Sequence, residues 1–194
     1  RDDISLFLPG DRARPYRERG ITTVQALIDA SLGAPSTLAA AWREGIPLLR
    51  RGAVTVPRAD VEVDVDMEAY MDQGAYLWGA RLNGEYIPFV TWDPLGGRAE
   101  AENFAEFWRW LMNVRAQAHA AGKTFAAYCY SAHGENHWMR RSATRFHYPD
   151  LAEVESFISS AEWVDLFAHV KRSFAGTTGL AMEGHVFTPP PPPG

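Results

Sequence analysis

The residues best suited to chemistry are three of the acids that alternate with apolar residues between positions 60 and 68. Alternate side chains share one face of a β-strand, so Asp64, Asp66 and Glu68 are expected to line up at intervals of about 7 Å. Carboxylates at this spacing repel one another, and a hard cation such as Mg²⁺ or Mn²⁺, which takes oxygen ligands, would relieve the repulsion. A solvated acidic strand face is the alternative that these residues alone leave open.

Two such ions could activate a water molecule and stabilise the leaving oxygen in phosphodiester hydrolysis. That chemistry needs several converging carboxylates, so further acids must come from other parts of the chain. Two candidates lie in polar positions where the chain turns: Glu135, just after an expected strand that ends at Tyr130, and Asp165.

The elements that would position these acids follow from hydrophobic periodicity. Alternation over residues 60–68 predicts a half-buried strand, and apolar runs at 75–82 and 86–92, separated by an Asn-Gly-Glu turn, predict a β-hairpin. The order βββαβα follows, because the remaining patterns predict a helix at 99–121, a buried strand at 124–130, a helix at 134–147 and one or two helices at 151–174.

Four short segments, taken in order along the chain, resemble a known family. They are the strand end at 65–68, Tyr76–Gly79, Tyr130–Glu135 and Val164–Leu166. Over roughly residues 56–180 the chain resembles the RNase H-like (YprB-type) C-terminal domain of bacterial RecB-like nucleases. The resemblance implies an α/β fold with an RNase H-like mixed sheet, and metal-dependent, exonuclease-like hydrolysis of DNA or RNA.

The same resemblance implies roles for individual acids. Asp66 and Glu68 would hold Mg²⁺ or Mn²⁺ as a D-x-E motif, with Asp64 as a weaker neighbour. Glu135 falls where this family places the acid of its second motif, although the wider exonuclease group has Asp there. Asp165 lies too early to be the final Asp of the third motif, so it is expected to be mainly structural and only a weaker metal candidate.

The third motif and the family's later lysine-bearing segment have no counterpart in this chain. Residues after Leu180 run instead into a glycine-rich stretch and five consecutive prolines. A member truncated at its C-terminus is therefore expected. The competing hypothesis is a non-catalytic remnant that keeps the fold and serves as a nucleic-acid-binding or structural module.

Outside the nuclease-like region, residues 1–45 predict a small helical unit. Thr22 or Thr23 can cap one helix, and Pro35 suits the first turn of the next. Parts of this unit are similar to the helix-hairpin-helix elements found beside nuclease domains, and a simple packing unit is the alternative. The expected organisation is the helical unit, a linker at 46–57, the incomplete nuclease domain at 58–178 and a disordered tail at 179–194.

The net charge of −5 argues against a protein coated with nucleic-acid-binding charge, since phosphate binding relies on Lys and Arg. Two local groups could still contact phosphates: Arg50 with Arg51, and Arg140 with Arg141. Solvated charged surface is the alternative for both groups. Nucleic acid, DNA rather than RNA, is the expected partner.

Other features exclude several classes of protein. Cys129 is the only cysteine, so an intrachain disulfide and a cysteine zinc cluster are excluded, and a cytoplasmic location is expected. No run of about 18 apolar residues predicts a membrane span.

His133 and His137 lie one helical turn apart but lack a third ligand, and a Cys129–His133 nucleophilic pair is disfavoured because burial raises a thiol pKa. The chain starts at Arg1 without Met, so it is expected to begin within a longer protein.

Overall fold

The computed structural model describes residues 1–180, and the chain divides into two compact units. Unit 2 is Val56–Ala168, and the described part of unit 1 combines residues 1–55 with 169–180. The division therefore lies about ten residues before the predicted end of the nuclease-like domain at 178. Most of the predicted tail, residues 181–194, lies outside the described residues.

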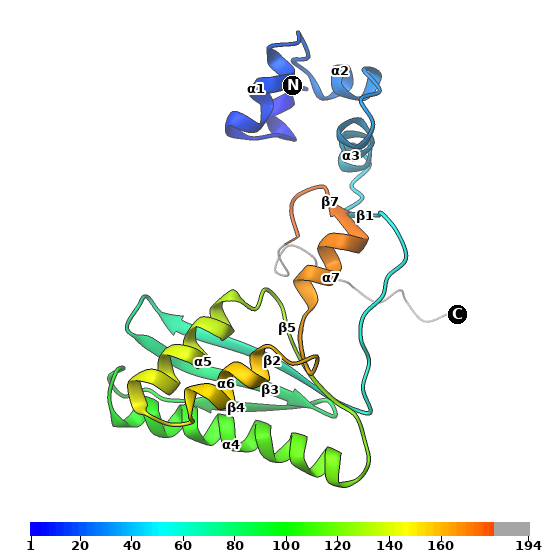
Figure 1. Ribbon diagram of the computed structural model, residues 1–194. Coiled ribbons are helices and arrows are strands. Elements are labelled where there is room, and N and C mark those ends of the chain that lie inside the picture. The colour runs from blue at the N-terminus through cyan, green and yellow to red at the C-terminus, as the bar shows by residue number, and fades with distance from the viewer. Residues whose placement is uncertain (181–194) are drawn as a thin grey trace, which may run out of the picture. The chain divides into compact units, whose positions relative to one another are not determined.

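Unit 2, which is described in full, is an α/β domain around a mixed five-stranded sheet of order β4-β3-β2-β5-β6 (Figure 1). The first three strands pair antiparallel in succession, whereas β5 lies parallel to β2 and β6 lies parallel to β5. This confirms the α/β class expected from the sequence. The strands are β2 (Val61–Tyr70), β3 (Gly74–Leu82), β4 (Glu85–Val90), β5 (Phe125–Cys129) and β6 (Trp163–Asp165).

The alternation in β2 has the predicted consequence for the two faces of the sheet. Val63 and Val65 are buried in the core, while the side chains of the intervening acids are exposed. Asn83 and Gly84 both have positive φ, at 51° and 81°, as a tight two-residue hairpin turn between β3 and β4 requires. Residue type and turn chemistry thus fix this meander locally.

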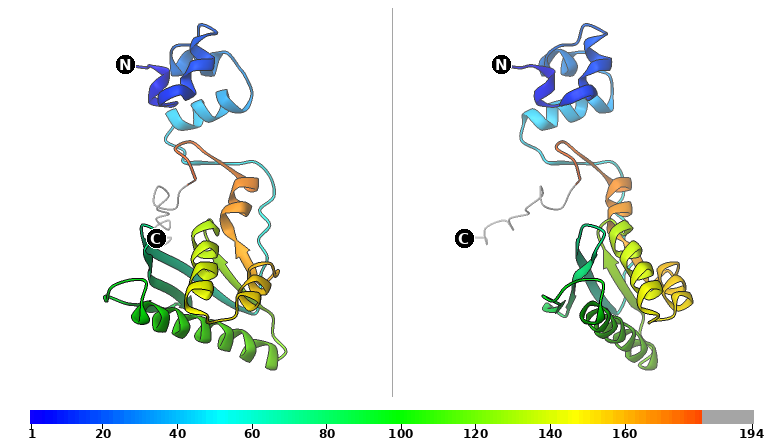
Figure 2. Two further views of the ribbon diagram at one scale, coloured as in Figure 1. Left: turned by 60° about the vertical axis from the view of Figure 1, so that its left-hand side comes forward. Right: turned by 90° about the vertical axis from the view of Figure 1, so that its left-hand side faces the viewer.

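Three helices of unit 2 pack on one face of its sheet, as both views in Figure 2 show. The aromatic stripe of the long helix is core, as predicted: Phe107 stacks on Trp78 with ring centroids 4.8 Å apart, and Phe104 lies 5.4 Å from the same indole. Within unit 2, no helix packs on the opposite face of β2, β3 and β4. The helices are α4 (Arg98–Ala120), α5 (His133–Phe146) and α6 (Leu151–Ile158).

The segment predicted as one or two helices at 151–174 is different in the structure. Helix α6 is followed by strand β6, and only then by α7 (Leu166–Ser173). Periodicity missed β6 because it has only three residues, and its pairing with β5, which aligns Trp163 with Ala127, involves residues distant in sequence. This strand matters for the site because it ends at Asp165.

Unit 1 begins with the predicted small helical unit. The hydroxyl of Thr23 caps α2 by accepting a hydrogen bond from the Ala26 N–H at 3.0 Å, and Pro35 lies in the first turn of α3. The predicted linker contains a strand, β1, which pairs antiparallel with β7. No helix within residues 1–180 is long and apolar enough to cross a membrane. The elements are η1 (Ile4–Leu6), η2 (Gly10–Ala13), α1 (Arg14–Arg17), α2 (Val24–Asp29), α3 (Ala34–Arg43), β1 (Leu48–Arg50) and β7 (Phe174–Gly176).

Candidate functional site

The acids of β2 lie where the strand extends beyond its parallel neighbour. Pairing with β5 runs only as far as Asp64 opposite Tyr128, whereas pairing with β3 continues to the end of β2. Asp66 and Glu68 therefore sit on the part of β2 that has no β5 partner, and both side chains are exposed. One Asp66 carboxylate oxygen accepts a hydrogen bond from the Met67 N–H at 2.9 Å.

Glu135 approaches the same edge from the helical side of the sheet. It lies in the first turn of α5, on the inward face that also carries Trp138 and Met139, and only 5% of it is exposed. Burial raises its pKa to about 7, and the negative charges of Asp66, Asp165 and Glu68 contribute to the rise. These four acids all lie near the carboxyl ends of the parallel strands, where open α/β sheets bind ligands.

Asp165 organises the loop that leads into α5. One of its carboxylate oxygens accepts hydrogen bonds from the N–H groups of Ser131 and Phe167, both at 2.9 Å. The other accepts one from the Ala132 N–H at 3.2 Å. Ser131 has a left-handed backbone, with φ of 66°, so the turn needs such an anchor. Asp165 therefore positions the start of the helix that carries Glu135.

The remaining acids of this β2 face differ from Asp66 and Glu68. Glu62 forms a two-pronged ion pair with Arg58, at 3.0 and 2.8 Å, and its carboxylate also lies 2.6 Å from the Tyr128 hydroxyl. Asp64 is exposed opposite Arg81, and its charge raises the pKa of Tyr128, after the larger effects of burial and Glu62. The acid row available to a ligand is thus centred on Asp66 and Glu68.

The donor atoms suit a hard divalent cation, because carboxylate oxygens are the ligands that Mg²⁺ and Mn²⁺ prefer. Among residues 1–180, however, no three His, Cys, Asp or Glu side chains stand close enough together to form a closed metal-binding group. The site therefore suits such a cation by the type of its oxygen donors and by its place at the strand ends. Asp66 and Glu68 face solvent there, and Glu135 is buried.

Sequence reasoning missed an aromatic side chain beside this acid row. Gly79 of β3 pairs with Asp66, and a Cβ at position 79 would lie only 2.6 Å from the Tyr86 hydroxyl oxygen. The ring of Tyr86 therefore lies across Gly79, next to Asp66 on the open face. A glycine inside an otherwise apolar strand was the available signal, since such glycines often mark a close approach.

The arginines proposed to contact nucleic acid have different environments. Arg50 lies in β1 of unit 1, where its Nε donates to the Gly52 carbonyl at 2.9 Å, and Arg51 follows it in the same unit. Arg140 on α5 forms a two-pronged ion pair with Glu155 of α6, at 2.6 and 3.2 Å. Arg141 instead lies over the Trp138 ring, with its guanidinium carbon 5.5 Å from the ring centroid.

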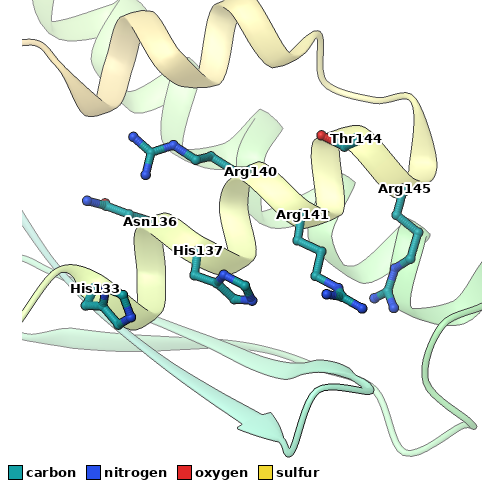
Figure 3. Close-up of a pocket in the computed structure, with 7 residues that line it drawn as sticks. All are labelled: His133, Asn136, His137, Arg140, Arg141, Thr144 and Arg145. Carbon is teal, nitrogen blue, oxygen red and sulfur yellow. The ribbon is translucent and has the colours of Figure 1, made fainter.

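An open groove of about 570 Å³ follows the outer side of α5 (Figure 3). At its far end Arg145 forms an ion pair with Glu100, which is only 1% exposed, and donates to the Gln73 carbonyl at 2.7 Å. The groove is lined by His133, Asn136, His137, Arg140, Arg141, Thr144 and Arg145.

The Cys129 thiol, considered as a nucleophile from the sequence, is buried. Cys129 is 2% exposed, and its thiol donates to the Val164 carbonyl at 3.7 Å. Burial raises its pKa, and the charges of Glu135 and Asp165 raise it further, so the thiolate is strongly disfavoured. His133, the base considered for it, is instead exposed in the α5 groove.

The structure thus places Asp66, Glu68 and Glu135 near the carboxyl ends of the parallel strands, a region that we call the acid edge, and Asp165 anchors the adjoining loop. No family model, curated protein or solved structure matches the chain.

Proposed function

We propose that unit 2 is an RNase H-like, divalent-metal-dependent nuclease domain that hydrolyses phosphodiester bonds, with DNA as the preferred substrate over RNA. Asp66, Glu68 and Glu135 would be its metal ligands. The observation that carries the proposal is the position of buried Glu135 at the carboxyl ends of the parallel strands, within electrostatic reach of Asp66 and Glu68.

A buried carboxylate surrounded by other carboxylates is costly for the folded protein, because nothing in the acid group compensates its charge. Burial is the main cause of the raised pKa of Glu135, and the negative charges of Asp66, Asp165 and Glu68 raise it further. Folds retain such repulsion mainly at functional sites, where a bound cation offsets it. This favours a cation site over a solvated acidic face.

The chain's own groups would divide the work as follows. Asp66 and Glu68 face solvent on β2 and can be reached by a phosphodiester on the open sheet face. Glu135 lies in the first turn of α5, and Asp165 fixes the loop that positions this turn. Mg²⁺ or Mn²⁺, when bound, would supply an activated water and stabilise the leaving oxygen.

A second candidate is a non-catalytic nucleic-acid-binding module with the same fold. Asp165 favours it, because within the described residues its carboxylate accepts three hydrogen bonds from backbone N–H groups, which commit this fourth acid to the loop. The two candidates differ in whether bound nucleic acid is cleaved.

Hydrolysis of labelled single-stranded DNA, duplex DNA and RNA with Mn²⁺ tests the proposal. We expect the 194-residue chain to cleave DNA, and Asp66→Asn and Glu135→Gln each to lower the rate about a hundredfold or more. The matched control is Asp72→Asn, which removes an exposed carboxylate from the adjacent β2–β3 turn and should leave the rate within about twofold.

Two outcomes would contradict the nuclease proposal. One is equal cleavage by Asp66→Asn and the unchanged chain, which would assign the activity to other residues or to a contaminant. The other is binding of DNA without cleavage of any of the three substrates, which would establish the non-catalytic candidate.

A further inference from the structure

Resting on the proposed function, we infer that His133, His137 and Arg141 form a surface that binds the phosphate backbone of a single nucleic-acid strand and places that strand beside the acid edge. We call these three residues the α5 row. They follow one another at intervals of four residues, so they lie along one side of α5, and Figure 3 shows them projecting to the same side of the helix.

The spacing of the row suits a chain of phosphates. Four residues of α-helix rise about 6 Å, which is comparable with the separation of successive phosphates along an extended strand. Asn136, Arg140 and Thr144 lie on the other side of the helix, where Arg140 pairs with Glu155 of α6 and Asn136 accepts a hydrogen bond from Trp163 at 2.7 Å. The row is therefore a single line of donors, which matches one strand of nucleic acid.

The row is also the part of the groove whose nitrogen donors are available. Arg140 is bonded to Glu155, and Arg145 is bonded to Glu100 and to a backbone carbonyl. Among residues 1–180, none of the three row residues has an acidic partner within ion-pair distance. Nitrogen donors that no acidic side chain occupies suit the phosphates of a polyanion, even in a chain of net charge −5.

Trp138 holds two members of the row in place. The ring of His137 packs edge-on against its indole, with centroids 5.2 Å apart, and the Arg141 guanidinium lies over the same indole. Trp138 is itself buried in the core, so this platform is fixed. Holding the two donors in advance reduces the side-chain entropy lost when phosphate binds.

The course of α5 connects the row to the acids. The helix starts beside β2, where a Cβ on Gly134 would lie 3.4 Å from the Met67 side chain. It ends where Arg145 reaches Gln73 in the β2–β3 turn. The row therefore runs alongside the half of β2 that carries Asp66 and Glu68, so a strand bound along it passes the acid edge.

Binding measured without catalysis tests the inference. Fluorescence anisotropy of a labelled oligothymidylate would be recorded with the 194-residue chain in EDTA, near neutral pH, over a series of salt concentrations. We expect His137→Gln/Arg141→Gln to weaken binding about tenfold. We also expect it to reduce the slope of log K against log salt by about 0.7, the value of one lost phosphate contact on a single strand.

Two variants control the measurement. Arg140→Gln removes the same charge from the same helix but from the ion pair with Glu155, so it should change the affinity less than twofold. Arg141→Lys keeps the charge and should keep the salt slope. Circular dichroism establishes that each variant is folded.

The inference fails if Arg140→Gln weakens binding as much as the double variant does, or if the double variant leaves the salt slope unchanged. It also fails if duplex binds in preference to single strand, or if the unchanged chain does not bind the oligonucleotide even at low salt. These results are independent of the nuclease proposal. Cleavage by the double variant with unchanged affinity would refute the proposed role of the α5 row alone. Binding that depends on the row, without cleavage, would refute the nuclease proposal alone.

Discussion

Glu135→Gln replaces the buried acid of the candidate site by a neutral side chain of nearly the same shape. In the folded chain the pKa of Glu135 rises from its ordinary 4.5 to about 7, chiefly because the carboxyl is buried. Each tenfold change in proton affinity is worth about 1.4 kcal/mol, so the ionised carboxylate destabilises the metal-free fold by about 3 kcal/mol.

The sign follows from proton binding. Between the unfolded pKa of 4.5 and the folded pKa of about 7, the folded state binds more protons than the unfolded state, so stability falls as the pH rises. Glutamine has no proton to lose. We therefore expect the advantage of Glu135→Gln in free energy of unfolding to grow by about 2 kcal/mol or more between about pH 5 and pH 8.

Urea unfolding in EDTA, followed by tryptophan fluorescence at several pH values, measures this difference. Glu106→Gln is the matched control, because it removes a carboxylate from the exposed side of α4, away from the acid edge. A difference between Glu135→Gln and the unchanged chain that does not vary with pH would refute the reasoning. So would an equal pH-dependent gain in Glu106→Gln.

Three further perturbations follow from the same contacts. Asp165→Ala removes the acceptor of three backbone hydrogen bonds, so it should lower the free energy of unfolding by about 2 kcal/mol or more. The stability of Asp165→Asn should lie between those of Asp165→Ala and the unchanged chain. An unchanged denaturation midpoint for Asp165→Ala would contradict this role. Glu100→Ala leaves Arg145 without its buried partner and should lower the free energy of unfolding by about 3 kcal/mol. The double variant Glu100→Ala/Arg145→Met should lose less than the sum of the losses in the two single variants. Additive losses in urea unfolding would show that the two residues are not coupled. Gly79→Ala puts a methyl group where the Tyr86 hydroxyl lies, so the ring must move while the fold persists; unchanged Tyr86 ring resonances in the NMR spectrum would show that the ring does not cover Gly79.

Local patterns predicted most of unit 2. The alternation of valines and acids in β2, the Asn83-Gly84 turn and the aromatic stripe of α4 each act over a few neighbouring residues, and each has its predicted place in the structure. The pairing of distant segments was less accessible. Strands β1, β6 and β7 have three residues each, too few to show a period, and they form because a partner elsewhere in the chain supplies their hydrogen bonds.

The candidate site divides in the same way. The sequence by itself determined that Asp66 and Glu68 share an exposed strand face, because side-chain direction along a strand follows from backbone geometry alone. Only the tertiary structure decided that buried Glu135 comes near them, that Asp165 anchors the loop before α5, and that Arg140 pairs with Glu155 while Arg141 lies over Trp138. These outcomes depend on where β5 ends relative to β2 and on how α5 and α6 pack, which are contacts between residues far apart in the chain.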